Sequence, residues 1–509
     1  MPTPVLRSLV LSGILAIGLP LVHAQNELPA TLIDLPQIGE PADSAMSPME
    51  ERRLGNEIVS QLYAYDYIDE DAELTDYVAR MGWRLAASSG VSTPDLRFFV
   101  IADDRINAFA LPGGFIGMNR GLLLAAKRES EVAGVMGHEL AHVTQRHIAR
   151  TQEGTQTATL ATWAAVLAAI IAGSADPDLV IGALSLGQAI NYQRQVNYTR
   201  AHELEADRIG IQTLARAGYD PQGMASFFGT LEQQSRLYGS GLPEFLRTHP
   251  LNTTRVSEAK ARASEMPQID YEDSIEFGLM QARARVRSFS RPSQALAYYS
   301  QSLRAGQDTP ANRYGMALAQ VGLGQPEAAL ASLEAALVHH PRQVNLLLAQ
   351  GAALRAAHQT EQGLAALDRT LGLYPRYTPA IFAYAEALID ADRAADARKI
   401  LLAHEQSLGK HVQTYRMLAE AAEESGDFAE AAYQMGTYLA VRGDYGSALA
   451  QLDAGLRLKE IDAQSRARLA AKRKEVRDAL PRNWRPPQAQ RRAVGVSAPP
   501  AAAFKAVAD

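Results

Sequence analysis

The residues best suited to chemistry lie in one short stretch, Gly134 to His147, which reads GVMGHELAHVTQRH. It contains the pattern H-E-x-x-H, formed by His138, Glu139 and His142. On a helix, residues four apart share a face, so both imidazoles can reach one metal ion. Glu139 beside them is placed to act as a general base for water at a zinc ion. The pattern alone fixes only three residues, and it also arises by chance.

A catalytic zinc site needs a third protein ligand. The continuation H-x-x-G-x-x-H is absent, because Gln145 and Ile148 stand where glycine and histidine would be. His147 follows His142 by about 500° of helix rotation, so it is predicted to point away from the shared face.

A carboxylate pair further along the chain is the better candidate. Glu203 and Asp207, in RAHELEADRIG, are four apart and share a helix face. One such carboxylate can bind zinc while the other hydrogen-bonds a ligand histidine. Glu205 and His202 are predicted to point elsewhere. From these residues alone, a solvated acidic face is an equally good interpretation.

These motifs, with INAFALPGG upstream, resemble the M48 family of zinc metallopeptidases over about residues 48–260. The resemblance implies one zinc ion per chain, bound by His138, His142 and Glu203, with Glu139 as the catalytic base. It also implies a supporting or proton-donating role for Asp207.

His249 lies in a Thr-His-Pro loop after both predicted ligand helices. It can act catalytically by stabilising the oxyanion of the tetrahedral intermediate, or it can cap the zinc in a resting state, and Arg255 can support it. The alternative is a loop histidine that hydrogen-bonds only to backbone. Both interpretations stay open.

The segment 106–119 (INAFALPGGFIGMN) predicts a hairpin around Pro112-Gly113-Gly114. An exposed strand edge beside the zinc can hold an extended peptide by main-chain hydrogen bonds. That edge is predicted at residues 115–119; a purely structural hairpin is the alternative. The residues predicted to bind substrate are Phe115, Ile116 and Gly117, with Asn107 and Ala108 nearer the zinc.

The spacing of apolar residues predicts helices from Pro48 onward, near Arg120 and Ser130, and around residues 198–217. Residues 96–102 (LRFFVIA) predict a strand. The expected fold of residues 48–265 is therefore mainly helical with a small β-sheet, the α+β zincin peptidase domain that the resemblance implies.

From about residue 275 the chain becomes rich in alanine and leucine, with a period of 34 residues between Pro341 and Pro375. Small residues recur at two places in this period, where they let paired helices approach closely. The two columns are Ala317, Gly351, Ala385 and Ala419, and Ala295, Ala329, Gly363, Ala397 and Ala431. The pattern resembles tetratricopeptide repeats and predicts an α-helical solenoid over residues 275–480.

The first 24 residues predict a cleavable signal peptide, with Arg7 in the n-region, an apolar stretch and a cut before Gln25; a retained N-terminal anchor is the alternative. The 509 residues include no cysteine, which fits export to a Gram-negative periplasm. The net charge of −6 does not suggest a nucleic-acid partner.

Three further segments have their own predictions. Residues 25–47 form an extended leader. The apolar run 158–172 is too short to span a bilayer and is read as a buried helix, with peripheral membrane contact as the alternative. Residues 481–509 are a disordered basic, Pro- and Ala-rich tail.

The predicted function is that of a periplasmic zinc endopeptidase joined to a repeat scaffold. The resemblance points to misfolded outer-membrane β-barrel precursors as substrates and to the outer-membrane β-barrel assembly machinery as partner of the repeats. Degradation of stalled precursors, and help in their assembly, is the implied task. The alternatives are a repeat-based chaperone or adaptor with a latent protease, and a general scavenging peptidase.

Overall fold

The computed structural model describes residues 46–91, 95–151, 200–237, 244–409, 411–478 and 480. The predicted signal peptide, most of the leader, the apolar run 158–172 and the tail 481–509 lie outside these residues. Within the described ranges, no helix combines the length and the apolar character needed to cross a bilayer.

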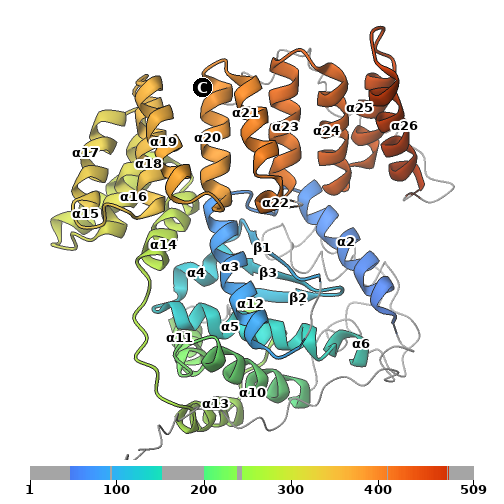
Figure 1. Cartoon of the computed structure of the whole chain (residues 1–509). Helices are drawn as coiled ribbons and strands as arrows, with labels where there is room; N and C mark the ends of the chain where they lie inside the picture. The colour runs from blue at the N-terminus through green and yellow to red at the C-terminus, as the bar shows by residue number, and fades with distance from the viewer. Residues whose placement is uncertain are drawn as a thin grey trace, which may run out of the picture. The chain divides into compact units, whose positions relative to one another are not determined.

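The first half of the chain combines helices with a small sheet (Figure 1). Its helices are α2 (Pro48–Ala64), α3 (Ala72–Ser88), α4 (Arg120–Ala125), α5 (Glu129–Thr144), α6 (His147–Thr151), α10 (Arg200–Arg216), α11 (Gly223–Leu237), α12 (Glu244–Thr248) and α13 (Thr253–Glu265). Its strands are β1 (Arg97–Ile101), β2 (Ala108–Leu111) and β3 (Phe115–Asn119). The predicted strand, hairpin and helix starts are therefore present, within a few residues of their expected positions.

The three described strands lie in the order β1-β3-β2. β1 runs parallel to β3, and β2 pairs with β3 in antiparallel register, with Ala108 opposite Met118 and Leu111 opposite Phe115. The turn between β2 and β3 uses Gly113 and Gly114 at φ 76° and 85°, a region that favours glycine. The prediction that residues 115–119 form an exposed edge is wrong, because β3 is paired on both sides and buried along its whole length.

Helices α5 and α10 pack closely against each other and carry the site residues. A Cβ atom built on Gly137 would lie 3.2 Å from the carbonyl oxygen of Gly210, and one on Gly210 would lie 3.1 Å from the backbone nitrogen of His138. Glycine at both positions therefore lets the two helices approach, and it brings the α10 carboxylates to the α5 histidines.

The second half consists of paired helices that follow one another in sequence order (Figure 1). They are α14 (Ile275–Ser288), α15 (Pro292–Arg304), α16 (Pro310–Val321), α17 (Pro326–Leu337), α18 (Val344–Ala356), α19 (Thr360–Leu373), α20 (Thr378–Asp390), α21 (Ala394–Ala403), α22 (Glu405–Leu408), α23 (Val412–Glu424), α24 (Phe428–Val441), α25 (Tyr445–Leu456) and α26 (Ala463–Asp478).

The predicted small-residue columns lie where these helices meet. A Cβ atom on Gly351 of α18 would come within 2.6 Å of Leu367 on α19, and Gly363 faces the Gly351 carbonyl oxygen across the same pair. Ala385 and Ala397, one period later, are fully buried on α20 and α21. The solenoid predicted from the 34-residue period is thus confirmed by close helix packing at the expected positions.

Candidate metal and catalytic site

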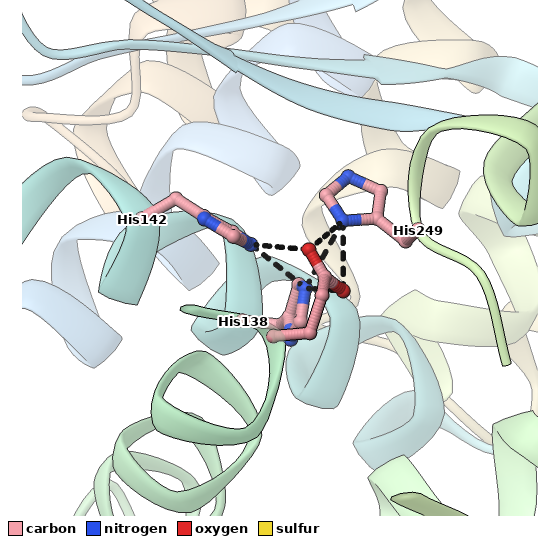
Figure 2. Close-up of side chains that lie close together, drawn as sticks. His138, His142 and His249 are labelled. Carbon is pink, nitrogen blue, oxygen red and sulfur yellow. Dashed lines mark hydrogen bonds and ion pairs between the residues drawn. The ribbon is translucent and has the colours of Figure 1, made fainter. Parts of the chain in front are cut away.

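Four buried side chains bring ligand atoms together, namely His138, His142, Glu203 and His249, and these atoms all lie within 4.8 Å of one another. Nε2 of His142 is 3.0 Å from Nε2 of His138, and Nδ1 of His249 is 3.0 Å from Oε1 of Glu203. Figure 2 shows the three imidazoles turned toward one carboxylate. Imidazole nitrogens with one carboxylate are a donor set that suits a catalytic zinc ion.

His249 reaches this cluster from a different part of the chain than the other three. It directly follows α12, and its backbone nitrogen donates to the carbonyl oxygen of Phe245 at 2.8 Å. Phe245 in turn donates its backbone N–H to the carbonyl oxygen of Ile106, which precedes β2. The His249 ring stacks on the Phe245 ring with centroids 4.8 Å apart. The interpretation of His249 as a loop histidine that bonds only to backbone is therefore wrong.

Glu139 is fully buried next to the cluster. Among the described residues, neither of its carboxylate oxygens makes a hydrogen bond of ordinary geometry, and Nε2 of His249 lies 3.5 Å from Oε1. Burial raises the pKa of Glu139, while His249, His138 and the backbone amide of Ala110 oppose that rise. A buried carboxylate without full hydrogen bonding is costly and calls for a functional explanation.

Asp207 lies next to Nδ1 of His138, and Arg255 holds Asp207 in place. Nδ1 of His138 lies 2.9 Å from Oδ1 of Asp207. Arg255 donates to both Asp207 oxygens at 2.7 and 2.8 Å, and its Nη1 lies 2.7 Å from Oε2 of Glu203. Arg255 also donates from Nη1 to the carbonyl oxygen of Pro250, the residue that directly follows His249.

The carboxylates of Glu203 and Asp207 favour positive charge in this cluster. Burial lowers the pKa of His138, but Asp207 and Glu203 outweigh it and raise the pKa to about 10. Burial raises the pKa of Glu203, but His249 and His138 outweigh it and hold the pKa well below its ordinary value. A buried carboxylate that stays charged needs a compensating cation, so the electrostatics also fit a divalent metal ion.

His147 has a role that the sequence did not reveal. Nδ1 of His147 lies 2.8 Å from Nδ1 of His142, on the side of that ring away from the cluster, and Nε2 of His147 lies 3.2 Å from Oε2 of Glu205. His147 lies outside the ligand cluster, and it reaches the far side of His142 because α5 ends at Thr144 and Arg146 takes a left-handed φ of 50°. The chain then turns back, and the only signal in the sequence was a third histidine close to the motif.

The predicted substrate residues are distributed differently from expectation. Phe115, Ile116 and Gly117 lie in the buried central strand, and a Cβ atom on Gly117 would meet the Phe109 ring at 2.5 Å. They are therefore core residues. Ala108 is the first residue of β2 and Asn107 directly precedes it; the backbone amide of Ala110 in this strand is next to Glu139. Among the described strands, β2 lies at the edge of the sheet on the side of the site, and its four residues are buried.

Comparisons with known proteins agree with this site. Residues 72–263 match Peptidase family M48, whose metallopeptidases depend on zinc. A Vibrio cholerae protein assigned to the beta-barrel assembly-enhancing proteases is 33% identical over 470 residues, which cover 92% of this chain and 96% of that protein. The beta-barrel assembly-enhancing protease of Escherichia coli is 40% identical over 250 residues, 49% of this chain and 51% of that one.

A mitochondrial metalloendopeptidase of Arabidopsis thaliana is 31% identical over 238 residues, which cover 45% of each chain. The similarity to the Vibrio protein, by contrast, runs through the peptidase half and the repeats together. This chain is therefore a zinc metalloendopeptidase of family M48, and it belongs to the family of the beta-barrel assembly-enhancing proteases.

Proposed function

We propose that this chain is a periplasmic endopeptidase that degrades stalled or misfolded outer-membrane β-barrel precursors and assists their assembly. The observation that carries the proposal is the similarity to a beta-barrel assembly-enhancing protease along nearly the whole chain, repeats included. Helical repeats of this kind present extended surfaces for protein partners. The partner proposed for them is the outer-membrane β-barrel assembly machinery.

The proposed metal ligands are His138, His142 and Glu203, which the α5–α10 packing brings together. When bound there, zinc acts as a Lewis acid that polarises the scissile carbonyl group and lowers the pKa of water. Asp207, whose Oδ1 lies 2.9 Å from Nδ1 of His138, is proposed to accept the Nδ1–H when the metal is bound, so that Nε2 presents its lone pair to the metal.

Glu139 is the proposed general base. Its raised pKa suits a group that must take a proton near neutral pH and release it again. It takes the proton of the attacking water and then transfers it to the nitrogen of the leaving amine. The buried setting, with both carboxylate oxygens short of hydrogen bonds, leaves them available for that exchange.

His249 is proposed to cap the site in this conformation. Its Nδ1 lies 3.0 and 3.2 Å from the two Glu203 oxygens and 3.3 Å from Nε2 of His138, so it fills the position next to the three proposed ligands. Substrate binding then requires the loop that carries His249 to move. A withdrawn His249 can donate a hydrogen bond to the developing oxyanion.

Strand β2 is the proposed substrate edge. The backbone nitrogen of Asn119 donates to the carbonyl oxygen of Asn107, and hydrogen-bonded pairs alternate along an antiparallel ladder. Phe109 and Leu111 therefore bond toward β3, while Ala108 and Ala110 direct their backbone groups to the other side. An extended peptide can add to this edge through main-chain hydrogen bonds.

A Glu139→Gln variant tests the proposal. We expect casein cleavage by the purified mature chain to fall by about 10²- to 10⁴-fold with zinc content unchanged, because only the base is removed. His138→Ala is the control that loses zinc as well. Complementation of a strain with a β-barrel assembly defect then separates the two functions. If Glu139→Gln complements fully, the chaperone or adaptor function is the main one.

A further inference from the structure

Nδ1 of His142, the ring nitrogen that faces away from the metal cluster, begins a series of contacts with three polar side chains. Nδ1 of His142 meets Nδ1 of His147 at 2.8 Å, Nε2 of His147 meets Oε2 of Glu205 at 3.2 Å, and Nη1 of Arg150 donates to the same oxygen at 3.1 Å. His142 and His147 are buried, and Glu205 and Arg150 are partly exposed. These side-chain contacts thus lead from the metal cluster to the protein surface.

Metal binding by His142 determines where the hydrogens of these side chains lie. Only one hydrogen can lie between two ring nitrogens 2.8 Å apart. If His142 offers the lone pair of Nε2 to a metal ion, its hydrogen is on Nδ1 and is donated to Nδ1 of His147. The hydrogen of His147 is then on Nε2 and is donated to Glu205, whose charge Arg150 balances. Each imidazole N–H in this arrangement has an acceptor.

The opposite arrangement is incompatible with metal binding by His142. With its hydrogen on Nε2, His142 would donate that N–H to Nε2 of His138, 3.0 Å away, and would have no lone pair for a metal ion. The tautomer of a metal-binding histidine is set by the hydrogen bond that its other nitrogen makes. For His142 that bond is the one to His147.

The His147 ring is itself held in place. It stacks on His202 of α10 with centroids 4.4 Å apart and an interplanar angle of 12°. Its backbone begins α6 directly after the left-handed turn at Arg146, whose side chain donates to the carbonyl oxygen of Met46 at 2.7 Å. The position and plane of the ring are therefore fixed by two helices and a turn.

We propose that His147 is a positioning residue for zinc binding, which fixes the tautomer and orientation of His142 and is in turn oriented by Glu205. The proposal deepens the proposed function and rests on the ligand role of His142. It assigns a function to three residues, His147, Glu205 and His202, that lie off the ligand face.

Zinc affinity of the full mature chain, measured by competition with a chromophoric chelator, tests the proposal. His147→Phe keeps a flat ring to stack on His202 but accepts no hydrogen bond, and we expect it to weaken zinc binding by about 10- to 100-fold. His147→Asn places a side-chain oxygen near the position of Nδ1, so it should restore most of the affinity. Glu205→Gln still accepts from Nε2–H and should change the affinity by no more than a few-fold.

A structural role alone would not produce this order of variants. The visible absorption bands of the cobalt-loaded chain provide a second measurement, because they report the ligand geometry: His147→Phe should shift them and His147→Asn should not. Wild-type affinity and spectrum in His147→Phe would overturn the proposal, as would a His147→Asn variant that is as weak as His147→Phe. If His147→Phe fails to fold, Glu205→Ala, at a partly exposed position, should still weaken zinc binding relative to Glu205→Gln.

The ligand role itself is tested separately with His142→Ala. If this variant retains zinc affinity, the proposed ligand set fails. If it loses affinity while His147→Phe does not, only the positioning role fails. In the His142→Ala background, adding His147→Phe should have no further effect on zinc affinity, because the two residues act through one contact.

Discussion

His138 and His142 are one helical turn apart on α5, yet the groups behind them differ in charge. His138 contacts Asp207, a carboxylate held by two hydrogen bonds from the buried Arg255. His142 contacts His147, an imidazole, and the carboxylate of Glu205 comes only after it. His138 is thus oriented by the charged pair of Asp207 and Arg255, its ionic support, and His142 by the neutral imidazole of His147.

The difference follows from the charge that a buried site can tolerate. Glu203 and Asp207 already place two carboxylates next to the cluster, and Arg255 contacts both. Glu139 is buried beside them as well, so a fourth buried carboxylate behind His142 would need another cation, because uncompensated buried charge is costly. The imidazole of His147 orients His142 without adding charge and leaves the Glu205 carboxylate near the surface.

The largest expected effect comes from breaking the ionic support with Arg255→Ala. Arg255 is 1% exposed, and its loss leaves Asp207 and Glu203 without their cation. We expect the free energy of unfolding without zinc to fall by about 3–5 kcal/mol. With zinc bound the loss should be smaller, because the ion compensates Glu203. Urea denaturation with and without zinc measures both values.

Arg262→Ala is the matched control for this change, because Arg262 lies on the same helix and pairs with Glu258 at the partly exposed surface. It should cost no more than about 1 kcal/mol. Equal losses in the two variants would show that the Arg255 pair is no stronger than a surface pair.

Zinc removal acts on both supports at once, since both orient ligands of the same ion. At a free zinc concentration of about 1,000 times Kd, zinc should stabilise the wild-type chain by about 4 kcal/mol, and a chelator should abolish this gain. Glu139→Gln should keep the gain and His138→Ala should lose it. Scanning calorimetry distinguishes these outcomes, and a gain retained in His138→Ala would contradict the ligand assignment.

Asp207→Asn isolates the charge of the ionic support while keeping its shape. We expect about 10- to 100-fold weaker zinc binding, because the neutral amide no longer makes His138 a stronger ligand. The same carboxylate-to-amide change at Glu205 should have little effect, because an imidazole separates Glu205 from His142. Chelator competition measures the zinc affinity of both variants, and equal losses of affinity would contradict the proposed difference between the two supports.

The smallest effect concerns His411, a partly buried imidazole outside the site, for which no charged group among the described residues offsets the cost of burial. Burial lowers its pKa to about 4, and among the described residues its buried Nδ1 has no hydrogen-bond partner. The unfolded chain, with a pKa of about 6.5, therefore binds more protons between pH 6.5 and 4.

The wild-type free energy of unfolding should accordingly fall as the pH drops through this window, with His411 contributing at most about 1.4 kcal/mol per pH unit. In His411→Leu this contribution should vanish, so the wild-type stability should fall more steeply than that of the variant between pH 6.5 and 4. Urea denaturation at several pH values measures the slopes, and parallel curves would show that His411 has the same pKa in the folded and the unfolded chain.

Much of the site was predictable because its determinants are local. Histidines four apart share a helix face, the Pro-Gly-Gly turn forces a hairpin, and the 34-residue period requires repeated helix pairs. The strand order was not predictable. Residues 115–119 and β2 have similar sequences of apolar residues, and only the parallel pairing with β1 makes β3 the central strand.

The sequence by itself determined the chemistry available to this protein: two imidazoles on one helix face with a carboxylate beside them, a carboxylate pair further along the chain, and a repeat scaffold. Only the tertiary structure decided which groups meet. The end of α5 at Thr144 and the turn at Arg146 bring His147 behind His142, and the loop after α12 places His249 in the cluster. Such contacts depend on where helices stop and how they cross, and residue spacing within a helix carries no information on either.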